Sequence, residues 1–228
     1  MNIIFLGAPG AGKGTQAENA GEKLNIPQIS TGAILREAIS KKTAAGQKAK
    51  KYVDNGELVP DDEVICILKD RLSAPDCTRG FILDGFPRTS KQAKYLENSG
   101  IAVDLVIDIE VPDEKIIERL SGRRVCPACG ASYHTIYNPS HRGMICGRCE
   151  AMLITREDDK PEVVLHRLET YHRRTEPLKE YYGKRGILET VIGQDDVAET
   201  TGLVFSIIDN FGARSECEQS PHTARANQ

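Results

Sequence analysis

A glycine-rich segment near the start of the chain has the composition of a phosphate-binding loop. It reads Gly7-Ala8-Pro9-Gly10-Ala11-Gly12-Lys13-Gly14-Thr15. An apolar run at residues 2–6 precedes it and a segment at 13–24 that suits a helix follows it, which is the context such a loop requires. Glycines let backbone N–H groups turn toward one centre, and Lys13 supplies a mobile positive charge for β- and γ-phosphates. The segment predicts a nucleoside triphosphate site; a flexible surface loop is the alternative.

Arginines further along the chain are candidates for binding the phosphates. A guanidinium fork can bind two phosphate oxygens at once, and a lysine in its place would keep the charge but lose that geometry. The candidates are Arg36, Arg88, Arg123, Arg156 and Arg167. Arg119 and Arg123 are four residues apart on a segment expected to be helical, so we predict that they share a helix face. A solvated helix face is the alternative for this pair.

Two tight cysteine pairs predict a metal site. Sixteen residues separate Cys126-x-x-Cys129 from Cys146-x-x-Cys149, a spacing typical of two zinc knuckles. Four thiolates leave no open position for water, so we expect a structural Zn²⁺ that stabilises a segment too short for its own core. His134 and His141 lie between the pairs and are alternative ligands, although we expect them to be surface or hydrogen-bonding residues. The other cysteines lack a metal-like spacing and are expected to be reduced and without function: Cys66, Cys77 and Cys217.

The elements that must position these residues form an alternating pattern. Apolar runs at 2–6, 80–83 and 105–109 are separated by helix-like segments, which predicts an α/β fold with a parallel sheet flanked by helices. A further apolar run at 203–208 favours a C-terminal helix over a strand. The pattern is broken at two places, which we interpret as insertions. The division is then a core at 1–29, 60–121 and 160–228, with insertions at 30–59 and 122–159; the polar tail from Gly212 to Gln228 is expected to fray.

Composition limits the possible functions. The chain has 228 residues, 39% of them hydrophobic, and a formal net charge of −3, which argues against disorder and against a protein that coats nucleic acid. The first residues have no positive n-region and too short an apolar run for a signal peptide, so we expect none, and no apolar run approaches membrane-spanning length. The cysteine count of seven is odd, and the paired spacing favours metal over disulfides. We therefore expect a cytoplasmic protein, and a monomer because no contiguous apolar surface stripe is left over.

Together these motifs resemble those of adenylate kinases, within the nucleoside monophosphate kinases. The resemblance covers residues 1 to about 210. Besides the opening Gly-x-Pro-Gly-x-Gly-Lys-Gly-Thr, it is carried by Phe81-Ile82-Leu83-Asp84-Gly85-Phe86-Pro87-Arg88-Thr89 with Gln92 and Ala93, Ser30-Thr31-Gly32 with Arg36, Gly56-Glu57-Leu58-Val59-Pro60-Asp61, and Arg156-x-Asp158-Asp159 followed by Arg167. It implies a P-loop NTPase-type sheet, a helical AMP-binding module at 30–59 and a zinc-binding lid at 122–159. The implied reaction is reversible, Mg²⁺-dependent transfer of the γ-phosphoryl group of ATP to AMP, giving two ADP.

The resemblance also implies a role for each site residue. The implied catalytic residues are Lys13, Asp84, Arg88, Arg123, Arg156 and Arg167, with Asp84 holding Mg²⁺ through bound water. The implied ATP contacts are Gly10, Ala11, Gly12, Lys13, Gly14, Thr15, Arg119, Arg123, Ser132, Tyr133 and Gln194, with Arg119 stacking on adenine and the Gln194 carbonyl facing its amino group. The implied AMP contacts are Thr31, Arg36, Glu57, Leu58, Val59, Gly85, Phe86, Pro87, Arg88, Gln92, Arg156 and Arg167.

One departure and three alternatives remain. The family usually has an acidic residue after Ser-Thr-Gly, where this chain has Ala33, so we expect altered mobility or affinity of the AMP module. A kinase for UMP, CMP or GMP, or one with a GTP donor, is the first alternative, and Gln92 and Thr31 favour AMP because an amide can pair with an adenine edge. A zinc-knuckle module that binds nucleic acid is the second; net acidity and few aromatic residues argue against it. An ATP sensor without turnover is the third, and the full arginine set argues against it.

Overall fold

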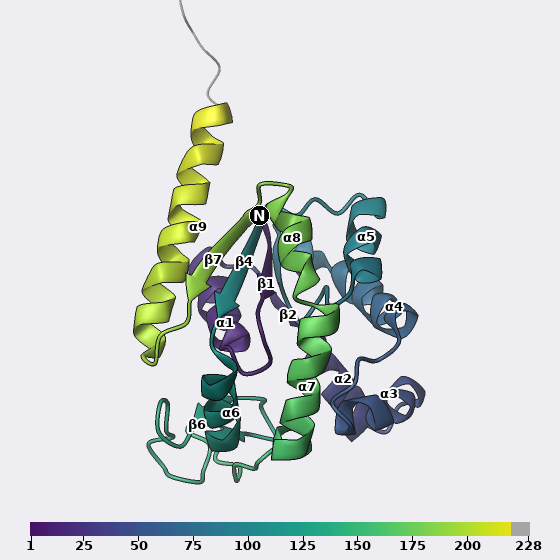
Figure 1. Cartoon of the computed structure of the whole chain (residues 1–228), viewed down its shortest axis with the longest axis vertical. Helices are drawn as coiled ribbons and strands as arrows, with labels where there is room; N and C mark the ends of the chain where they lie inside the picture. The colour runs from purple at the N-terminus through teal and green to yellow at the C-terminus, as the bar shows by residue number, and fades with distance from the viewer. Residues whose placement is uncertain (220–228) are drawn as a thin grey trace, which may run out of the picture.

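A computed structural model describes the backbone of residues 1–219 and the side chains of residues 1–213. Its main sheet has five parallel strands in the order β2-β3-β1-β4-β7. These strands are β1 (Asn2–Leu6), β2 (Gln28–Ser30), β3 (Phe81–Asp84), β4 (Leu105–Glu110) and β7 (Leu188–Ile192). The order places β1, which leads into the glycine-rich loop, at the centre of the sheet (Figure 1).

Helices cover both faces of this sheet, as the sequence predicts. They are α1 (Lys13–Leu24), α2 (Thr31–Ser40), α3 (Ala44–Asp54), α4 (Asp61–Leu72), α5 (Ser90–Asn98), α6 (Asp113–Gly122), α7 (Pro161–Arg174), α8 (Pro177–Gly183) and α9 (Val197–Gln219), with short 3₁₀ helices η1 (Pro75–Cys77) and η2 (Glu157–Asp159). Successive residues of a strand point to opposite faces, so Ile3 and Phe5 pack with α1, α6, α7 and α9 while Ile4 and Leu6 pack with α2, α4, α5 and α8. The expected doubly covered parallel sheet is confirmed.

The two segments that we interpret as insertions contain helices and strands of their own. Residues 30–59 hold α2 and α3, which pack against each other. Residues 122–159 hold the antiparallel pair of β5 (Arg123–Val125) and β6 (Ser132–His134), followed by η2, and are called the lid below. In Figure 1 the lid lies below the sheet, at the end toward which the strand arrows point. Both segments therefore lie near the carboxyl ends of the strands, where the glycine-rich loop also lies.

Two expectations are wrong in detail. Arg123 does not share a helix face with Arg119, because α6 ends at Gly122 and Arg123 is extended and pairs with His134 in the lid ladder. Helix α9 continues past Gly212 to Gln219, with buried Val204 and Ile208 in its earlier turns, and fraying of the tail stays a prediction; residues 220–228 and the Cys217 side chain lie outside the described part. The apolar run at 203–208 lies within α9, as predicted.

The second correction concerns the expectation that no contiguous apolar surface is left over, which the lid contradicts. Large apolar side chains are exposed there, and two of them, Ile145 and Met152, are partners in a β-bridge. They belong to a module whose buried core consists only of Cys126, Ala131, Cys146 and Leu153 among the described residues. A core this small cannot bury every apolar residue of the segment, so an apolar surface is left over. No described helix is both long and apolar enough to cross a membrane.

Candidate active site

The glycine-rich loop folds back on the side chain of Lys13. Gly7, Gly10 and Gly12 have φ values of 133°, 90° and 100°, a region that residues with a Cβ atom rarely adopt. At Gly7 a Cβ atom would also lie 2.5 Å from the carbonyl oxygen of Ile109 on β4. Lys13 begins α1, and its Nζ donates to the carbonyl oxygens of Gly7 and Ala8, both at 2.7 Å. Gly12 provides no side-chain cap for α1, which leaves first-turn N–H groups free to bind an anion.

The electrostatic environment of Lys13 is set by burial, by two arginines and by carboxylates on the two strands beside β1. Burial, together with the positive charges of Arg88 and Arg167, lowers the pKa of Lys13 to about 8, although Asp84 and Asp108 oppose this shift. These two aspartates flank β1, since Phe5 pairs with Asp84 on β3 and Leu6 pairs with Asp108 on β4. The neutral amine fraction of Lys13 should therefore gain a proton when an anion of higher charge binds beside it.

Asp84 lies where a hydrated divalent cation could bridge the carboxylate and a loop-bound phosphate. A Cβ atom added to Gly14 would lie 3.6 Å from its Oδ2, so the carboxylate borders the glycine-rich loop. The Thr15 hydroxyl follows one residue later on α1. Carboxylate and hydroxyl oxygens suit Mg²⁺, which binds through few protein ligands and keeps several waters. The residues present therefore fit the expected cation.

The arginines of the lid and of α7 gather around two adjacent carboxylates. Arg123 donates through Nε to Oδ2 of Asp159 at 2.8 Å and through Nη2 to its Oδ1. Arg156 makes the same forked contact with Asp158, at 2.9 and 2.7 Å. Arg167 joins the two, with Nη1 2.6 Å from the Asp158 carbonyl oxygen and 3.0 Å from Asp159 Oδ1.

These contacts keep the carboxyl group of Asp158 ionised. Burial opposes ionisation of Asp158, but Arg156 and Arg167 overcome it and lower its pKa to about 2. The side chain of Asp159 is 0% exposed and faces both Arg123 and Arg167. The aspartates therefore hold three guanidinium groups in one place before any phosphate is bound.

A second group of polar contacts lies between β2, β3 and α2. The hydroxyl of Thr31 and Nε of Arg88 both donate to the Gly85 carbonyl oxygen, at 2.8 and 2.9 Å. Burial and the neighbouring arginines, Arg156 first among them, lower the pKa of Arg36 to about 9. A Cβ atom on Gly32 would lie 3.0 Å from the guanidinium of Arg36, so α2 packs closely on this side chain. Gly85, Phe86 and Pro87 are buried beside it.

Gln92 lies next to this group at the start of α5. It is 2% exposed; its Oε1 accepts from the Arg88 backbone N–H at 2.8 Å, and its Nε2 donates to Asp61 at 2.7 Å. An amide has two acceptor lone pairs and two N–H donors, so one of each remains for an adenine edge. Residues Glu57, Leu58 and Val59 lie in the loop between α3 and α4, with Val59 buried. Their proposed contact with the base stays a prediction.

At the other end of the site, the structure brings together Arg119 and Gln194. Nη2 of Arg119 donates to the Gln194 carbonyl oxygen at 2.6 Å, although 75 residues separate them in the chain. Ser132 is exposed on β6, while the Tyr133 hydroxyl accepts from the N–H of Gly147 at 3.0 Å, inside the second cysteine knuckle. Both residues therefore lie in the lid, and their contact with ATP stays a prediction.

The four paired cysteines converge on one point. Their Sγ atoms all lie within 4.8 Å of one another, with Cys126 and Cys149 at 3.3 Å and Cys129 and Cys146 at 3.6 Å. Tetrahedral zinc with Zn–S bonds of about 2.3 Å requires S···S separations near 3.8 Å, so the arrangement fits Zn²⁺. Backbone N–H groups of Cys129 and Arg148 lie 3.5 and 3.4 Å from the first sulfur of each knuckle. His134 and His141 are outside this cluster, as expected.

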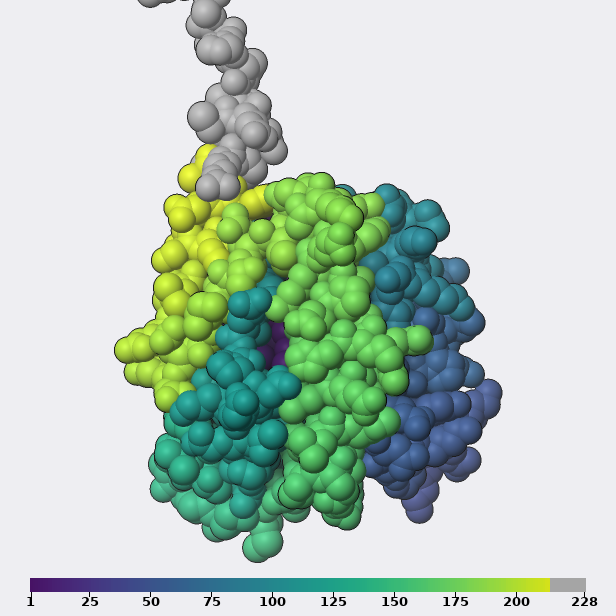
Figure 2. All heavy atoms as spheres, in the orientation of Figure 1, coloured from purple at the N-terminus to yellow at the C-terminus, as the bar shows by residue number. Residues whose placement is uncertain are grey.

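The cationic side chains outnumber the carboxylates of this region. Six cations interact electrostatically with one another and with the carboxylates of Asp84, Asp158 and Asp159: Lys13, Arg36, Arg88, Arg123, Arg156 and Arg167. Asp108 also acts on Lys13, but its charge is paired with that of Lys179. The formal excess is therefore about three positive charges. Figure 2 shows an opening between the teal and green surfaces through which atoms of the N-terminal segment are visible. A ligand with several negative charges would neutralise this excess.

Some polar contacts of the site have no signal in the sequence. Asp61 accepts from both Gln92 and the Thr89 hydroxyl, across 31 and 28 residues. Asp108 is fully buried within β4, 2.7 Å from Nζ of Lys179 on α8. Only the packing of α4 on α5 and of α8 near β4 creates these pairs, so no spacing rule could find them.

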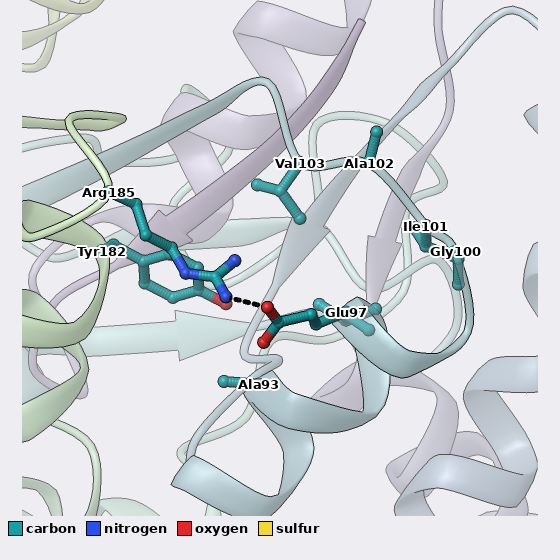
Figure 3. A pocket seen from close by; sticks show the side chains of 9 residues that line it. Ala93, Glu97, Gly100, Ile101, Ala102, Val103, Tyr182 and Arg185 are labelled. Atoms are coloured by element: carbon teal, nitrogen blue, oxygen red, sulfur yellow. Dashed lines mark ion pairs between the residues drawn. The ribbon is translucent and has the colours of Figure 1, made fainter.

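A cavity of about 360 Å³ lies apart from this site. Its lining includes Leu96, Tyr182 and the loop before β4, and an ion pair between Glu97 and Arg185 crosses it (Figure 3). Because β4 begins at Leu105, this loop lies at the amino ends of the parallel strands. The glycine-rich loop follows the carboxyl end of β1, so the cavity and the loop lie at opposite ends of the parallel strands.

Comparison with known proteins places this geometry in a family. The family described as adenylate kinase matches residues 5–187. An adenylate kinase of Caldicellulosiruptor saccharolyticus is 55% identical over 212 residues, covering 91% of this chain and 99% of the relative. One of Caldicellulosiruptor bescii is 56% identical over the same shares, and one of Archaeoglobus fulgidus is 53% identical over 86% of this chain and 93% of the relative. The chain belongs to the adenylate kinase family.

Proposed function

We propose that the cationic cluster binds the phosphates of ATP and AMP and transfers the γ-phosphoryl group between them, the reaction of an ATP:AMP phosphotransferase. The observation that carries this proposal is the excess of positive charge around the glycine-rich loop. Phosphoryl transfer spreads negative charge over the moving group, so catalysis depends on positioning and electrostatic stabilisation. The products of transfer to AMP are two ADP, and the reaction is reversible.

In this proposal each group of residues binds a different part of the substrates. The loop residues 10–15 and Lys13 hold the β- and γ-phosphates of ATP, while Arg36 and Arg88 hold the phosphate of AMP. Arg123, Arg156 and Arg167 surround the transferring group, because Asp158 and Asp159 already hold them together. Arg119 and the Gln194 carbonyl face the adenine of ATP. Gln92, Thr31 and the 57–59 loop face the adenine of AMP.

In this proposal two metal ions take part, one with the nucleotide and one in the lid. Mg²⁺ entering with ATP would neutralise developing charge on the phosphates, held by Asp84 through water. Zn²⁺ in the four-cysteine cluster would be structural, because its ligands are complete and, besides the ligands Cys126 and Cys146, the buried core of the described lid consists of Ala131 and Leu153. The lid can then exclude water from the site, so that the phosphoryl group reaches AMP instead of being hydrolysed.

The remaining expectations belong to the same proposal. We propose a cytoplasmic enzyme that acts as a monomer in adenine nucleotide homeostasis, without nucleic acid or membrane partners. Sedimentation velocity at micromolar concentration tests the monomer directly, and the exposed apolar residues of the lid make this a real test.

Phosphorus NMR of the purified protein with Mg-ATP tests the reaction. AMP, UMP, CMP and GMP are offered in turn, and only AMP is expected to be converted rapidly, with ADP the sole product. Faster turnover of UMP, CMP or GMP would instead indicate a kinase for that nucleoside monophosphate. Release of free phosphate without an acceptor would refute the transferase assignment.

A further inference from the structure

An ion pair connects the second cysteine knuckle to the helix that follows the glycine-rich loop. Nη1 of Arg148 donates to Oε1 of Glu18 at 2.7 Å, between residues 130 apart in the chain. Glu18 lies on α1, and Arg148 lies between Cys146 and Cys149. The contact therefore joins the lid to the core element that carries Lys13.

The position of Glu18 on α1 determines which part of the core the lid covers. Glu18 is five residues after Lys13, which places it about 7.5 Å farther along the helix axis. A lid held at Glu18 must extend over the start of α1, where the phosphates of a nucleotide would bind. On its other side the lid reaches the AMP module, because η2 packs against α3 and α7. The described lid thus spans from α1 to α3.

The knuckle gives Arg148 a fixed starting point. The backbone N–H of Arg148 lies 3.4 Å from Sγ of Cys146, inside the tight turn between the two cysteines. A side chain on such a fixed turn samples fewer positions than one on a flexible loop, so less conformational entropy is lost when it forms an ion pair. Both partners remain partly exposed, Arg148 at 60% and Glu18 at 40%, so the pair can break and re-form.

We propose that Glu18 and Arg148 are positioning residues that hold the lid closed over bound ATP. This inference rests on the proposed function. Exposed ion pairs stabilise by small amounts, so loss of this one should shift the balance between closed and open lid by about two- to fivefold. Such a shift is enough to alter nucleotide affinity and release without touching the chemical step.

Steady-state kinetics of four variants test the proposal. Glu18→Gln and Arg148→Glu are each expected to raise KM for ATP about two- to fivefold while kcat is unchanged or higher, because a less stable closed state binds ATP less tightly and releases product sooner. The double variant Glu18→Arg with Arg148→Glu restores the opposite charges and is expected to return KM toward the starting value. Glu22→Gln is the matched control, because Glu22 is exposed on the same helix.

Hydrogen exchange of the lid amides gives a readout that does not depend on turnover. With Mg-ATP and no AMP, exchange across residues 122–159 should be faster in Glu18→Gln than in the control, and the double variant should slow it again. Equal behaviour of Glu18→Gln and Glu22→Gln in both assays, or no recovery in the double variant, overturns the proposal. If the unmodified protein fails to phosphorylate AMP, the proposed function fails, while the exchange pattern still decides whether the ion pair holds the lid.

Discussion

Lys13 should take up a proton when ATP binds at alkaline pH. Its pKa is lowered from 10.5 to about 8 by burial and nearby arginines. The added negative charge of ATP beside Nζ favours the ammonium form, so the pKa rises well above 8 in the complex. At pH 8.5 about a quarter of the free protein carries a charged Lys13, so binding should take up roughly three quarters of a proton; at pH 7 the value is about a tenth.

Isothermal titration calorimetry measures this uptake. Mg-ATP is titrated without AMP, so that no transfer occurs, in buffers of different ionisation enthalpy, and the slope of binding enthalpy against ionisation enthalpy gives the protons exchanged. Lys13→Arg is the control, since a guanidinium stays charged at pH 8.5. In ¹³C-lysine-labelled protein, the Cε shift of Lys13 reports the pKa directly. Uptake near zero at pH 8.5 in the unmodified protein, or the same uptake in Lys13→Arg, would refute this account of the loop.

Three further changes test the site, the lid and a surface contact. Arg88→Lys keeps the charge but loses the fork, so kcat should fall on the order of 10²-fold with little change in melting temperature, as measured by coupled assay and calorimetry. Chelation of the lid metal should lower the melting temperature by several degrees and be reversed by added Zn²⁺; an unchanged melting curve would argue against a structural metal. His172 lies 2.9 Å from both Glu176 and Asp113, which raise its pKa above the ordinary 6.5. Its contribution to stability is therefore full below pH 6.5 and is lost as pH rises through the raised pKa, and His172→Gln should flatten that part of a plot of melting temperature against pH.

The fold was predictable where local pattern and topology agree. The runs at 2–6, 80–83 and 105–109 became central strands because they are buried on both faces, which makes them continuously apolar. β2 has only three residues, and β7 is an edge strand with exposed Glu189 and Thr190, so neither has that signature. Arg123 was misplaced because α6 ends at Gly122, where the chain becomes extended and pairs with β6, a non-local contact.

The site was predictable in its residue types but not in its contacts. The glycine-rich loop and the cysteine pairs have fixed spacings, because each closes a local geometry around one ligand. The pairing of Arg123 with Asp159 and of Arg119 with the Gln194 carbonyl depends on how the lid and the loop after β7 lie against the core. Such contacts arise from tertiary packing, which no spacing within the chain records.

Asp158 and Asp159 lie beside arginines that, in the proposed function, bind phosphates, so their carboxylates need a physical explanation. Without them, the guanidinium groups of Arg123, Arg156 and Arg167 would repel one another in a partly desolvated place. With them, the forks are held in position before the substrate arrives, which lowers the cost of ordering the side chains during binding.

This arrangement still leaves donors for the substrate. A guanidinium has five N–H donors, and Arg123 directs only Nε and Nη2 at Asp159. Arg156 likewise uses Nε and Nη2 on Asp158, so Nη1 of each fork keeps its N–H groups. The carboxylates thus act as positioning anions that need not leave when phosphates bind. Two carboxylates among three arginines also leave one positive charge unbalanced, so the cluster stays attractive to a transferring phosphoryl group.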